Sequence, residues 1–522
     1  MNINKILIVG GGTSGWMTAA SIFKALPNVE VSLVESKSIP TIGVGESTLG
    51  QFNIFLDMLG LKDEDWMAEC NATYKNGIRF NNFSDLGTSY DYPFGGRDRI
   101  DIKNKWAAVR DCYNLPTNES YNEWHNENSL LMKYNRCTKN HDGLLDAFDF
   151  RYDTAYHFDA KLFAEFLKKF CTGVEHHYDK IVNVNKDEYG YITSVDGQLH
   201  GNYTADLFID CTGFQSRLLE KEMGSEFLSY KPWLDNDRAL AAHIPYRDRS
   251  KELVNYTKCT GIDNGWVWNT PLWDSLGVGY VYSSDFVSDD TAEMQLKQHL
   301  GVDDIDFRRI NIRHGIHKEG WVKNVVAIGL SYCFVEPLES SSLASTHECL
   351  LRLIRTLKDR NCRVNRFDID LYNIASANDM DSWRDFVAIH YTASSRDDTR
   401  YWRHQTQEKS YVNLGSGKFI KHNVLNDGIT FDDKYQGLSQ NLFGYAGGWT
   451  YVMAGNGYKI PAHKRQQEYN AYQSYGLPYS PDEVEHLYLQ WRKRIKHLSN
   501  EIQKLPTHDI FLSQHIYKQK LL

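Results

Sequence analysis

A glycine-rich turn near the start of the chain constrains the fold more than any other feature. Four apolar residues at 6–9 predict a buried strand, and the motif Gly10-x-Gly12-x-x-Gly15 follows them directly. The residues Thr13–Ala25 then predict a helix, and a second apolar strand at Val29–Val34 ends beside Glu35. This order of strand, turn, helix and strand is typical of a dinucleotide-binding unit in a parallel sheet.

Each glycine of this turn has its own physical role. Gly10 permits the tight turn, Gly12 lets a pyrophosphate approach the backbone, and Gly15 lets the helix pack closely on the strand. Free N–H groups at the start of the helix attract phosphate. Glu35, twenty residues beyond Gly15, is placed to accept a hydrogen bond from a ribose hydroxyl. The stretch therefore predicts a bound dinucleotide, and it does not distinguish FAD from NAD.

Composition excludes several other classes of protein. The chain has 522 residues, of which 42% are hydrophobic and 24% charged, which is ordinary for a globular protein with room for two or more packed units. A net charge of −9 argues against nucleic acid as a partner. No apolar run approaches the ~18 residues of a membrane span. Nine scattered cysteines without a CxxC pair indicate a reduced, cytoplasmic protein without a metal site.

Further patterns predict an α/β fold. Strands at Asp206–Gly213 and Asn324–Gly329 extend the doubly wound, Rossmann-like module, and short strands between 240 and 282 predict an added antiparallel sheet. We divide the chain into a nucleotide-binding module at 1–360, with a loop-rich insertion at about 81–150, and a mainly helical part at 361–522. Helices are predicted at 49–59, 156–170, 346–357 and 382–391, and from a capping signal at Ser480 and Pro481.

Three segments resemble those of flavin-dependent halogenases of the tryptophan-halogenase type. Gly265–Pro271, GWVWNTP, is similar to the GWxWxIP signature of that family, with Thr270 in place of the usual isoleucine. The segment around Lys75 resembles the one that holds the family's essential lysine, and Phe334–Ser342 resembles its PLEST-G segment. Supporting matches extend the resemblance over most of the chain: Gly10–Gly15, Gly45–Ser47, Asp206–Gly213, His390–Trp402 and 449–461.

The resemblance implies a two-component enzyme with FAD as its cofactor. A separate flavin reductase would supply FADH2, which with O2 and a halide ion yields a hypohalous acid. That acid would pass through a tunnel to Lys75, which positions or activates it for attack on an electron-rich aromatic ring of the indole, tryptophan or phenol type. Glu339 would stabilise the cationic ring adduct and take its proton. Ser340 would help to hold Lys75.

The resemblance also assigns the remaining parts of the site. The residues implied in binding FAD are Gly10, Gly12, Thr13, Ser14, Gly15, Glu35, Gly45, Glu46, Ser47, Gly329 and Leu330. Trp266 and Trp268 would lie near the flavin and keep the substrate away from it, which disfavours hydroxylation. Ser341 and Ser342 would bind the halide.

One departure from the family pattern concerns that halide site. The family usually has Thr-Gly where this chain has Ser341 and Ser342. A glycine permits a positive φ and close approach of an ion, whereas a serine adds a hydroxyl. This change motivates the hypothesis that bromide or iodide is used, and the preferred halide stays open.

Two alternative functions remain. A flavin-dependent aromatic hydroxylase shares the nucleotide motifs, but oxygen transfer to a ring needs neither the paired tryptophans nor Lys75. A non-catalytic flavin-binding protein is the second alternative, although Lys75, Glu339 and both tryptophans are present. An NAD-dependent dehydrogenase lacks support because no second glycine-rich turn is evident. Candidate walls of a substrate pocket are Phe94, Tyr445 and Trp449. The sequence does not decide the oligomeric state, including whether the protein is a homodimer.

Overall fold

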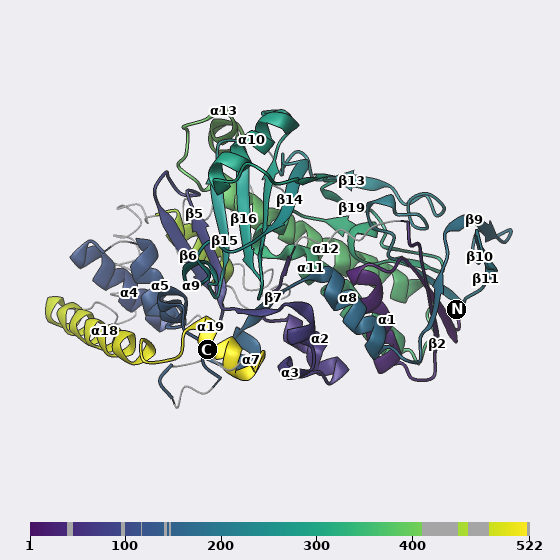
Figure 1. Cartoon of the computed structure of the whole chain (residues 1–522), viewed down its shortest axis with the longest axis horizontal. Coiled ribbons are helices and arrows are strands. Elements are labelled where there is room, and N and C mark those ends of the chain that lie inside the picture. Colours follow the sequence, from purple (N-terminus) through teal and green to yellow (C-terminus); the bar gives the residue numbers. More distant parts are fainter. Residues whose placement is uncertain are drawn as a thin grey trace.

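Two large sheets and the helices packed on them form the centre of the molecule (Figure 1). The computed structural model describes residues 1–38, 45–95, 100–115, 117–139, 143–145, 148–409, 447–457 and 480–518. The first sheet has six strands in the order β20-β21-β12-β1-β2-β8. Its strands are β1 (Lys5–Val9), β2 (Glu30–Glu35), β8 (Glu175–Tyr178), β12 (Leu207–Asp210), β20 (Trp321–Val322) and β21 (Val325–Ala327).

The first sheet confirms the predicted nucleotide-binding unit. β1 pairs in parallel with β2 and with β12, so that Val9 lies opposite both Val34 and Asp210. The apolar residues of β1 are buried, as the continuous hydrophobic run requires in a strand covered on both faces. Helix α1 (Thr13–Ala25) packs against α8 (Ala160–Phe170) and α11 (Ser341–Asp359). The predicted strands at Asp206–Gly213 and Asn324–Gly329 correspond to β12 and β21.

The second sheet has seven strands in the order β18-β14-β17-β16-β15-β5-β6. These are β5 (Gly77–Asn81), β6 (Ser89–Pro93), β14 (Arg238–Ile244), β15 (Thr257–Ile262), β16 (Gly265–Pro271), β17 (Leu276–Tyr282) and β18 (Arg308–Asn311). All neighbours are antiparallel except β5 and β15. The predicted antiparallel sheet is therefore present with one parallel pair. The region assigned to a loop-rich insertion contributes β6 to it.

A small third sheet places the residues around Lys75. It joins β3 (Glu46–Ser47), β7 (Ala155–Phe158) and β4 (Thr73–Lys75) in the order β3-β7-β4. The prediction of one helix over 156–170 was wrong at its start, because residues 155–158 form β7. Asp159 ends that strand and caps α8, since its side chain accepts hydrogen bonds from the N–H groups of Lys161 and Leu162.

The remaining strands and several short helices pack around the three sheets described above. Smaller strands are β9 (Ile181–Lys186), β10 (Ile192–Gly197), β11 (Gly201–Tyr203), β13 (Phe227–Ser229), β19 (Gly315–His317) and β22 (Cys333–Phe334). Short helices are α3 (Asp63–Trp66), α7 (Phe150–Asp153), α9 (Arg249–Glu252), α10 (Asp289–Leu300), α13 (Arg400–Arg403) and α19 (His508–His515). β9 and β10 form an antiparallel hairpin around Tyr189 and Gly190. Within the described residues, no helix combines the length and the apolar character needed to cross a membrane.

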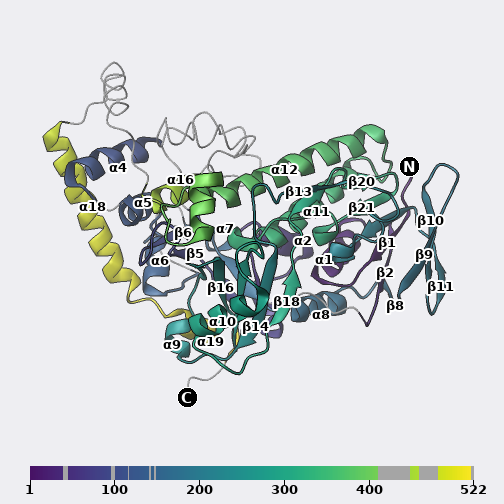
Figure 2. The same ribbon diagram turned by 90° about the horizontal axis from the view of Figure 1, so that it is seen from above.

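The helices predicted at 49–59, 346–357 and 382–391 are present with other bounds. α2 (Phe52–Leu59) and α11 begin at other residues than predicted, and α12 (Arg366–Thr392) is a long helix that packs beside α11 (Figure 2). α18 (Pro481–Ile502) begins as predicted, with a capping box between Ser480 and Glu483.

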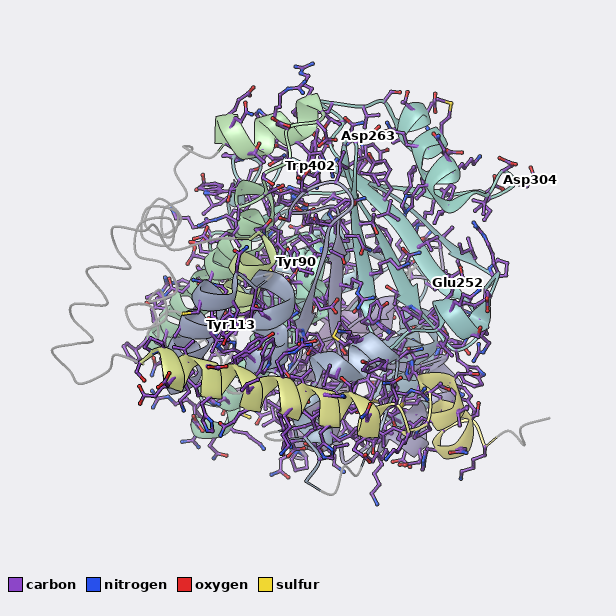
Figure 3. The ribbon with its side chains drawn as sticks, turned by 90° about the vertical axis from the view of Figure 1, so that its left-hand side faces the viewer. Tyr90, Tyr113, Glu252, Asp263, Asp304 and Trp402 are labelled. Carbon is purple, nitrogen blue, oxygen red and sulfur yellow. The ribbon has the colours of Figure 1, made fainter. Side chains whose placement is uncertain are left out.

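One end of the molecule is mainly helical. It contains α4 (Ile100–Tyr113), α5 (Thr117–His125), α6 (Ser129–Tyr134), α16 (Gly447–Gly455) and α18. Figure 3 views this end, with α18 lying across the front. Tyr90 of β6, labelled in the same view, is buried, and α16 packs against β6.

Candidate active site

A cavity of about 430 Å³ begins at the ends of β1 and β2. We call it the flavin cavity. The predicted cofactor residues that line it are Gly10, Gly12, Thr13, Ser14, Glu35, Gly45, Glu46, Ser47 and Leu330. Gly15 and Gly329 do not line the cavity but pack behind it, since a Cβ on Gly329 would lie 2.4 Å from the Ser14 hydroxyl. The structure thus brings nine of the eleven predicted residues to one cavity.

The glycine-rich turn fits a dinucleotide for reasons of space and charge. Gly10 has a φ of +112°, and a Cβ there would lie 2.2 Å from the carbonyl oxygen of Cys211. A Cβ on Gly15 would lie 1.9 Å from the carbonyl oxygen of Gly10. The N-cap of α1 is Gly12, so no side chain caps this helix. Its first N–H groups therefore remain available to phosphate oxygens.

Glu35 is held in place by His176. The Nε2 atom of His176 lies 2.8 Å from an oxygen of Glu35. Burial lowers the pKa of His176 to about 4, so its ring is neutral and donates this hydrogen bond. Burial also raises the pKa of Glu35. The carboxyl group is thus positioned at the end of β2, where a ribose hydroxyl of a dinucleotide is bound in this type of fold.

The segment Gly45–Ser47 contributes a short strand to the cavity wall. Glu46 and Ser47 form β3, and the N-cap of α2 is Gln51. Glu46 is half-buried and faces the flavin cavity, where burial raises the pKa of its carboxyl to about 7.

Two tryptophans form a fixed wall of the flavin cavity. Trp266 and Trp268 alternate with Val267 on β16, so both side chains lie on one face of the strand, and both line the cavity. The indole N–H of Trp266 donates to an oxygen of Glu336 at 2.9 Å. A Cβ on Gly279 would lie 2.0 Å from the ring of Trp268, so the glycine leaves room for that ring.

Lys75 of β4 is completely buried, and Ser340 separates its Nζ from the flavin cavity. Its Nζ donates to the carbonyl oxygen of Thr48 at 2.9 Å and to the hydroxyl of Ser340 at 2.7 Å. Ser340 lines the cavity and Lys75 does not. Burial lowers the pKa of Lys75 to about 7, an effect that the negative charge of Glu339 opposes. The ring of Phe94 lies 4.8 Å from Nζ, which places this candidate wall residue at the lysine.

Glu339 lies near enough to Lys75 for its charge to act on the lysine, and it is hydrogen-bonded to His390. The Nε2 atom of His390 is 2.7 Å from Oε1 of Glu339, and its Nδ1 atom is 2.9 Å from the carbonyl oxygen of Phe386. Through its two ring nitrogens, His390 links Glu339 to the backbone of α12. Oε2 of Glu339 has no hydrogen-bond partner among the described residues. Both side chains are almost fully buried.

The start of α11 faces the flavin cavity through Ser342, and Ser341 points elsewhere. The Ser341 hydroxyl donates to the carbonyl oxygens of Val335 and Glu336. Ser342 lies inside the helix, so the positive φ expected of a glycine there does not occur; the residue with a φ of +60° is Ser340. Ser342 lines the cavity near the positive end of a 19-residue helix, which favours an anion.

The other predicted wall residues fall outside what the structure describes. Tyr445 lies outside the described residues, and Trp449 belongs to α16 but its side chain is not described. α16 packs closely on β6, since a Cβ on Gly455 would lie 2.3 Å from the ring of Tyr90.

Sequence reasoning missed four residues that hold the site together: His157, Thr257, Glu336 and His390. Glu336 and His390 lie inside segments used for the resemblance, but neither was assigned a role. All four residues of β7 are buried, so no alternation along the strand marks His157. No local pattern marks Thr257.

Comparison with known proteins adds a consistent set of matches. The family model described as tryptophan halogenase matches residues 5–471. Tryptophan 6-halogenase SttH of Streptomyces toxytricini is 36% identical over 425 residues, which cover 77% of this chain and 80% of that protein. The 7-chloro-L-tryptophan 6-halogenase KtzR of Kutzneria sp. (strain 744) is 37% identical over 426 residues, or 76% of this chain and 81% of that protein. The solved structure titled "VirX1 apo structure" superposes with a TM-score of 0.90 at 38% identity, covering 99% of this chain and 100% of that one.

Proposed function

This chain belongs to the tryptophan halogenase family, and on that premise we propose that Lys75 and Glu339 direct the halogenation of an electron-rich aromatic small molecule. The family is flavin-dependent, so the cofactor is FAD, used as FADH2 with O2 and a halide ion. When bound, reduced FAD would supply two of the four electrons that reduce O2, and the halide, which is oxidised to the level of hypohalous acid, would supply the other two. The residues of this chain bind the reactants and guide the product of that step.

The observation that carries the proposal is the position of Lys75. Its Nζ is buried and lies 2.7 Å from the hydroxyl of Ser340, which itself lines the flavin cavity. A small oxidant that leaves the cavity past Ser340 reaches Lys75 next. Because the pKa of Lys75 is about 7, its ammonium and amine forms are both accessible near neutral pH. The ammonium donates a hydrogen bond to the oxidant's oxygen, which makes the halogen more electrophilic.

Glu339 acts on the other reactant. The halogen bonds to a ring carbon, the oxygen of the hypohalous acid leaves as water, and the ring loses one proton. Oε2 of Glu339 is free to stabilise the cationic ring and to accept that proton, while Oε1 stays bound to His390. Trp266 and Trp268 wall the cavity and keep the substrate away from the flavin.

The substrate we propose is tryptophan or another indole. SttH and KtzR are named for halogenation of tryptophan and 7-chloro-L-tryptophan. Aromatic side chains gather beside the lysine and the glutamate: Phe94 lies over Nζ, and the negative charge of Glu339 acts on Tyr90 and Tyr92. The partner we propose is a separate flavin reductase, which delivers FADH2 by diffusion.

A product assay tests this function. The purified protein receives FAD, a flavin reductase, NADH, O2 and either bromide or chloride, together with tryptophan, indole and phenol in separate reactions. We expect products whose mass shows that one halogen has replaced one hydrogen, and none when halide is omitted. Hydroxylated products would contradict the proposal and favour the monooxygenase alternative. Turnover without any modified aromatic compound across the panel would also contradict it.

A further inference from the structure

A chain of hydroxyl groups connects Lys75 to a buried histidine that the proposed chemistry does not use. We propose that His157 is a positioning residue for Lys75 and acts through the hydroxyls of Thr257, Ser47 and Ser340, whose hydrogen bonds all point away from the lysine. This inference rests on the proposed role of Lys75. The direction of each bond follows from its neighbours, beginning at the far end.

Beyond His157, the series of hydrogen bonds stops at a backbone carbonyl oxygen. The hydroxyl of Thr73 lies 2.6 Å from the carbonyl oxygen of Pro271, which only accepts, so Thr73 donates its hydrogen there. The Nδ1 atom of His157 lies 3.2 Å from the same hydroxyl oxygen. Because the hydrogen of Thr73 is already used, Nδ1 must carry a proton and donate it to Thr73.

The other ring nitrogen of His157 is then an acceptor. His157 is fully buried, and burial, the charge of Lys75 and the nearby His508 lower its pKa well below the ordinary range. The ring is therefore neutral, with its single proton on Nδ1. Its Nε2 lies 2.8 Å from the hydroxyl of Thr257, so Thr257 donates to it.

The remaining bonds follow in order toward the lysine. The Thr257 oxygen accepts from Ser47 at 2.8 Å, and Ser47 accepts from Ser340 at 3.0 Å. Ser340 in turn accepts from Nζ of Lys75 at 2.7 Å. The three hydroxyl residues of this hydrogen-bond chain line the flavin cavity. Lys75 and His157 lie at its two ends and do not line the cavity.

The small sheet explains why these side chains meet. In its register, His157 of β7 lies opposite Ser47 of β3 on one side and Thr73 of β4 on the other. Paired residues of neighbouring strands project to the same face of a sheet, and so do residues two apart. Lys75 follows Thr73 by two positions, so it lies on that face as well. One face of the small sheet thus carries both Lys75 and His157, the two ends of the hydrogen-bond chain.

The direction of the chain matters for Lys75. The hydrogen of Ser340 is committed to Ser47, so Ser340 presents only lone pairs to Nζ. This arrangement stabilises the ammonium form and fixes the direction of its N–H bonds. The other groups that act on the charge of Lys75 are Glu339 and Cys259, which both favour the ammonium form. Breaking the chain at Thr257 leaves those two groups and the Ser340 oxygen in place, but it frees the hydrogens of Ser47 and Ser340 to turn, so Ser340 is no longer held as a directed acceptor for Nζ.

Histidine NMR tests the starting point of the chain without FAD, halide or substrate. The whole protein is labelled with ¹⁵N-histidine and studied at about two pH units above the ordinary histidine pKa. The signal of His157 is identified by its loss in a His157→Gln variant. We expect one protonated nitrogen, Nδ1, and an unprotonated Nε2. A ring protonated on Nε2, or on both nitrogens, would overturn the proposal.

A pair of threonine variants tests the effect on Lys75. Thr257→Val removes the link, and Thr260→Val makes the same change three residues along β15, where the hydroxyl accepts from Asn81 and does not line the cavity. Loss of a directed acceptor lowers the pKa of an ammonium. The rate of halogenation as a function of pH should have one limb that reports the titration of Lys75. In Thr257→Val we expect this limb to move to lower pH by about 0.5–1 unit.

The outcomes of this experiment distinguish the possibilities. Thr260→Val should leave the limb in place, and Thr257→Ser, which keeps the hydroxyl, should leave it close to its wild-type position. A Thr257→Val profile that superposes on that of the wild type, or equal shifts in both valine variants, would overturn the proposal. If the wild-type protein does not halogenate at all, the proposed function fails, while the tautomer of His157 still tests the chain.

Discussion

The flavin cavity and the cluster of Lys75, Glu339, Ser340 and His390, which we call the lysine cluster, are built in opposite ways. The cavity starts from one short motif, in which glycines and the free end of α1 create space and positive potential. The lysine cluster consists of buried side chains from distant segments, and the contact between Lys75 and Ser340 spans 265 positions. The cavity therefore depends on backbone conformation, and the cluster depends on the packing of the whole fold.

This contrast predicts that substitutions in the two regions abolish different properties of the protein. A change in the glycine turn should abolish cofactor binding and weaken the fold. A change in the lysine cluster should leave the cofactor bound and stop the reaction with the aromatic substrate. The following predictions test that separation, beginning with the largest effect.

Gly10→Ala should have the largest effect. The added Cβ would lie 2.2 Å from the Cys211 carbonyl oxygen, at a φ of +112° that alanine rarely adopts. We expect a loss of FAD affinity of about 10³-fold or more and destabilisation by several kcal/mol, on the order of other severe backbone clashes. Flavin fluorescence titration and denaturant unfolding measure both. Gly87→Ala, also at a positive φ but facing open space, is the matched control and should bind FAD normally. Equal losses in both variants would contradict a specific role for the turn.

Glu339→Gln should affect only the lysine cluster. The amide can still contact His390 but cannot accept the ring proton as a carboxylate does. We expect the rate of aromatic halogenation to fall by about 10²–10⁴-fold, the usual contribution of a general base, with unchanged FAD affinity. Product quantification and flavin titration measure the two quantities. A variant that halogenates at the wild-type rate would remove Glu339 from the proposed mechanism.

The buried Lys75 should also make stability depend on pH. Its pKa is about 7 in the folded protein and about 10.4 in an unfolded chain, so between these values the unfolded state binds more protons. The free energy of unfolding should therefore rise with pH across this window, by up to about 1.4 kcal/mol per pH unit. Denaturant unfolding of the wild type and Lys75→Met at several pH values isolates this contribution. Parallel curves for the two proteins would show that Lys75 has an ordinary pKa.

Ser342→Gly should have the smallest effect. Ser342 lies in the helix and lines the cavity, so the substitution removes one CH2OH group, whose hydroxyl is its single polar group. We expect the ratio of brominated to chlorinated product to change by less than about tenfold, as is typical for one polar contact. Competition with mixed halides measures this ratio. An unchanged ratio would separate Ser342 from halide selection, and exclusive chlorination by the wild type would reject the hypothesis of bromide or iodide use.

The contrast between the two regions also explains what could be predicted from the sequence. The glycine turn, Glu35 and the strands β1, β2, β12 and β21 follow local rules and were predicted, whereas the edge strands β8 and β20 were not. Lys75 was assigned only through the resemblance, because a lysine beside Asn76 and Gly77 carries no local sign of burial. His157 was missed because residues 156–170 look like one amphipathic helix until the sheet β3-β7-β4 is known. The sequence left open whether Ser342 takes the positive φ that a glycine permits, and the structure places the positive φ at Ser340.

The most direct test of the separation between the two regions is a comparison of Lys75→Met with Lys258→Met. Met keeps the length and volume of Lys without its charge, and Lys258 is a half-buried lysine of β15 that does not line the flavin cavity. Oxidation of FADH2, release of hypohalous acid to a chemical trap, and halogenation of the aromatic substrate are measured together. We predict that Lys75→Met retains FADH2 oxidation and releases oxidant to the trap, but loses aromatic halogenation, while Lys258→Met resembles the wild type. Normal aromatic halogenation by Lys75→Met, or an equal loss of FADH2 oxidation, would contradict the account.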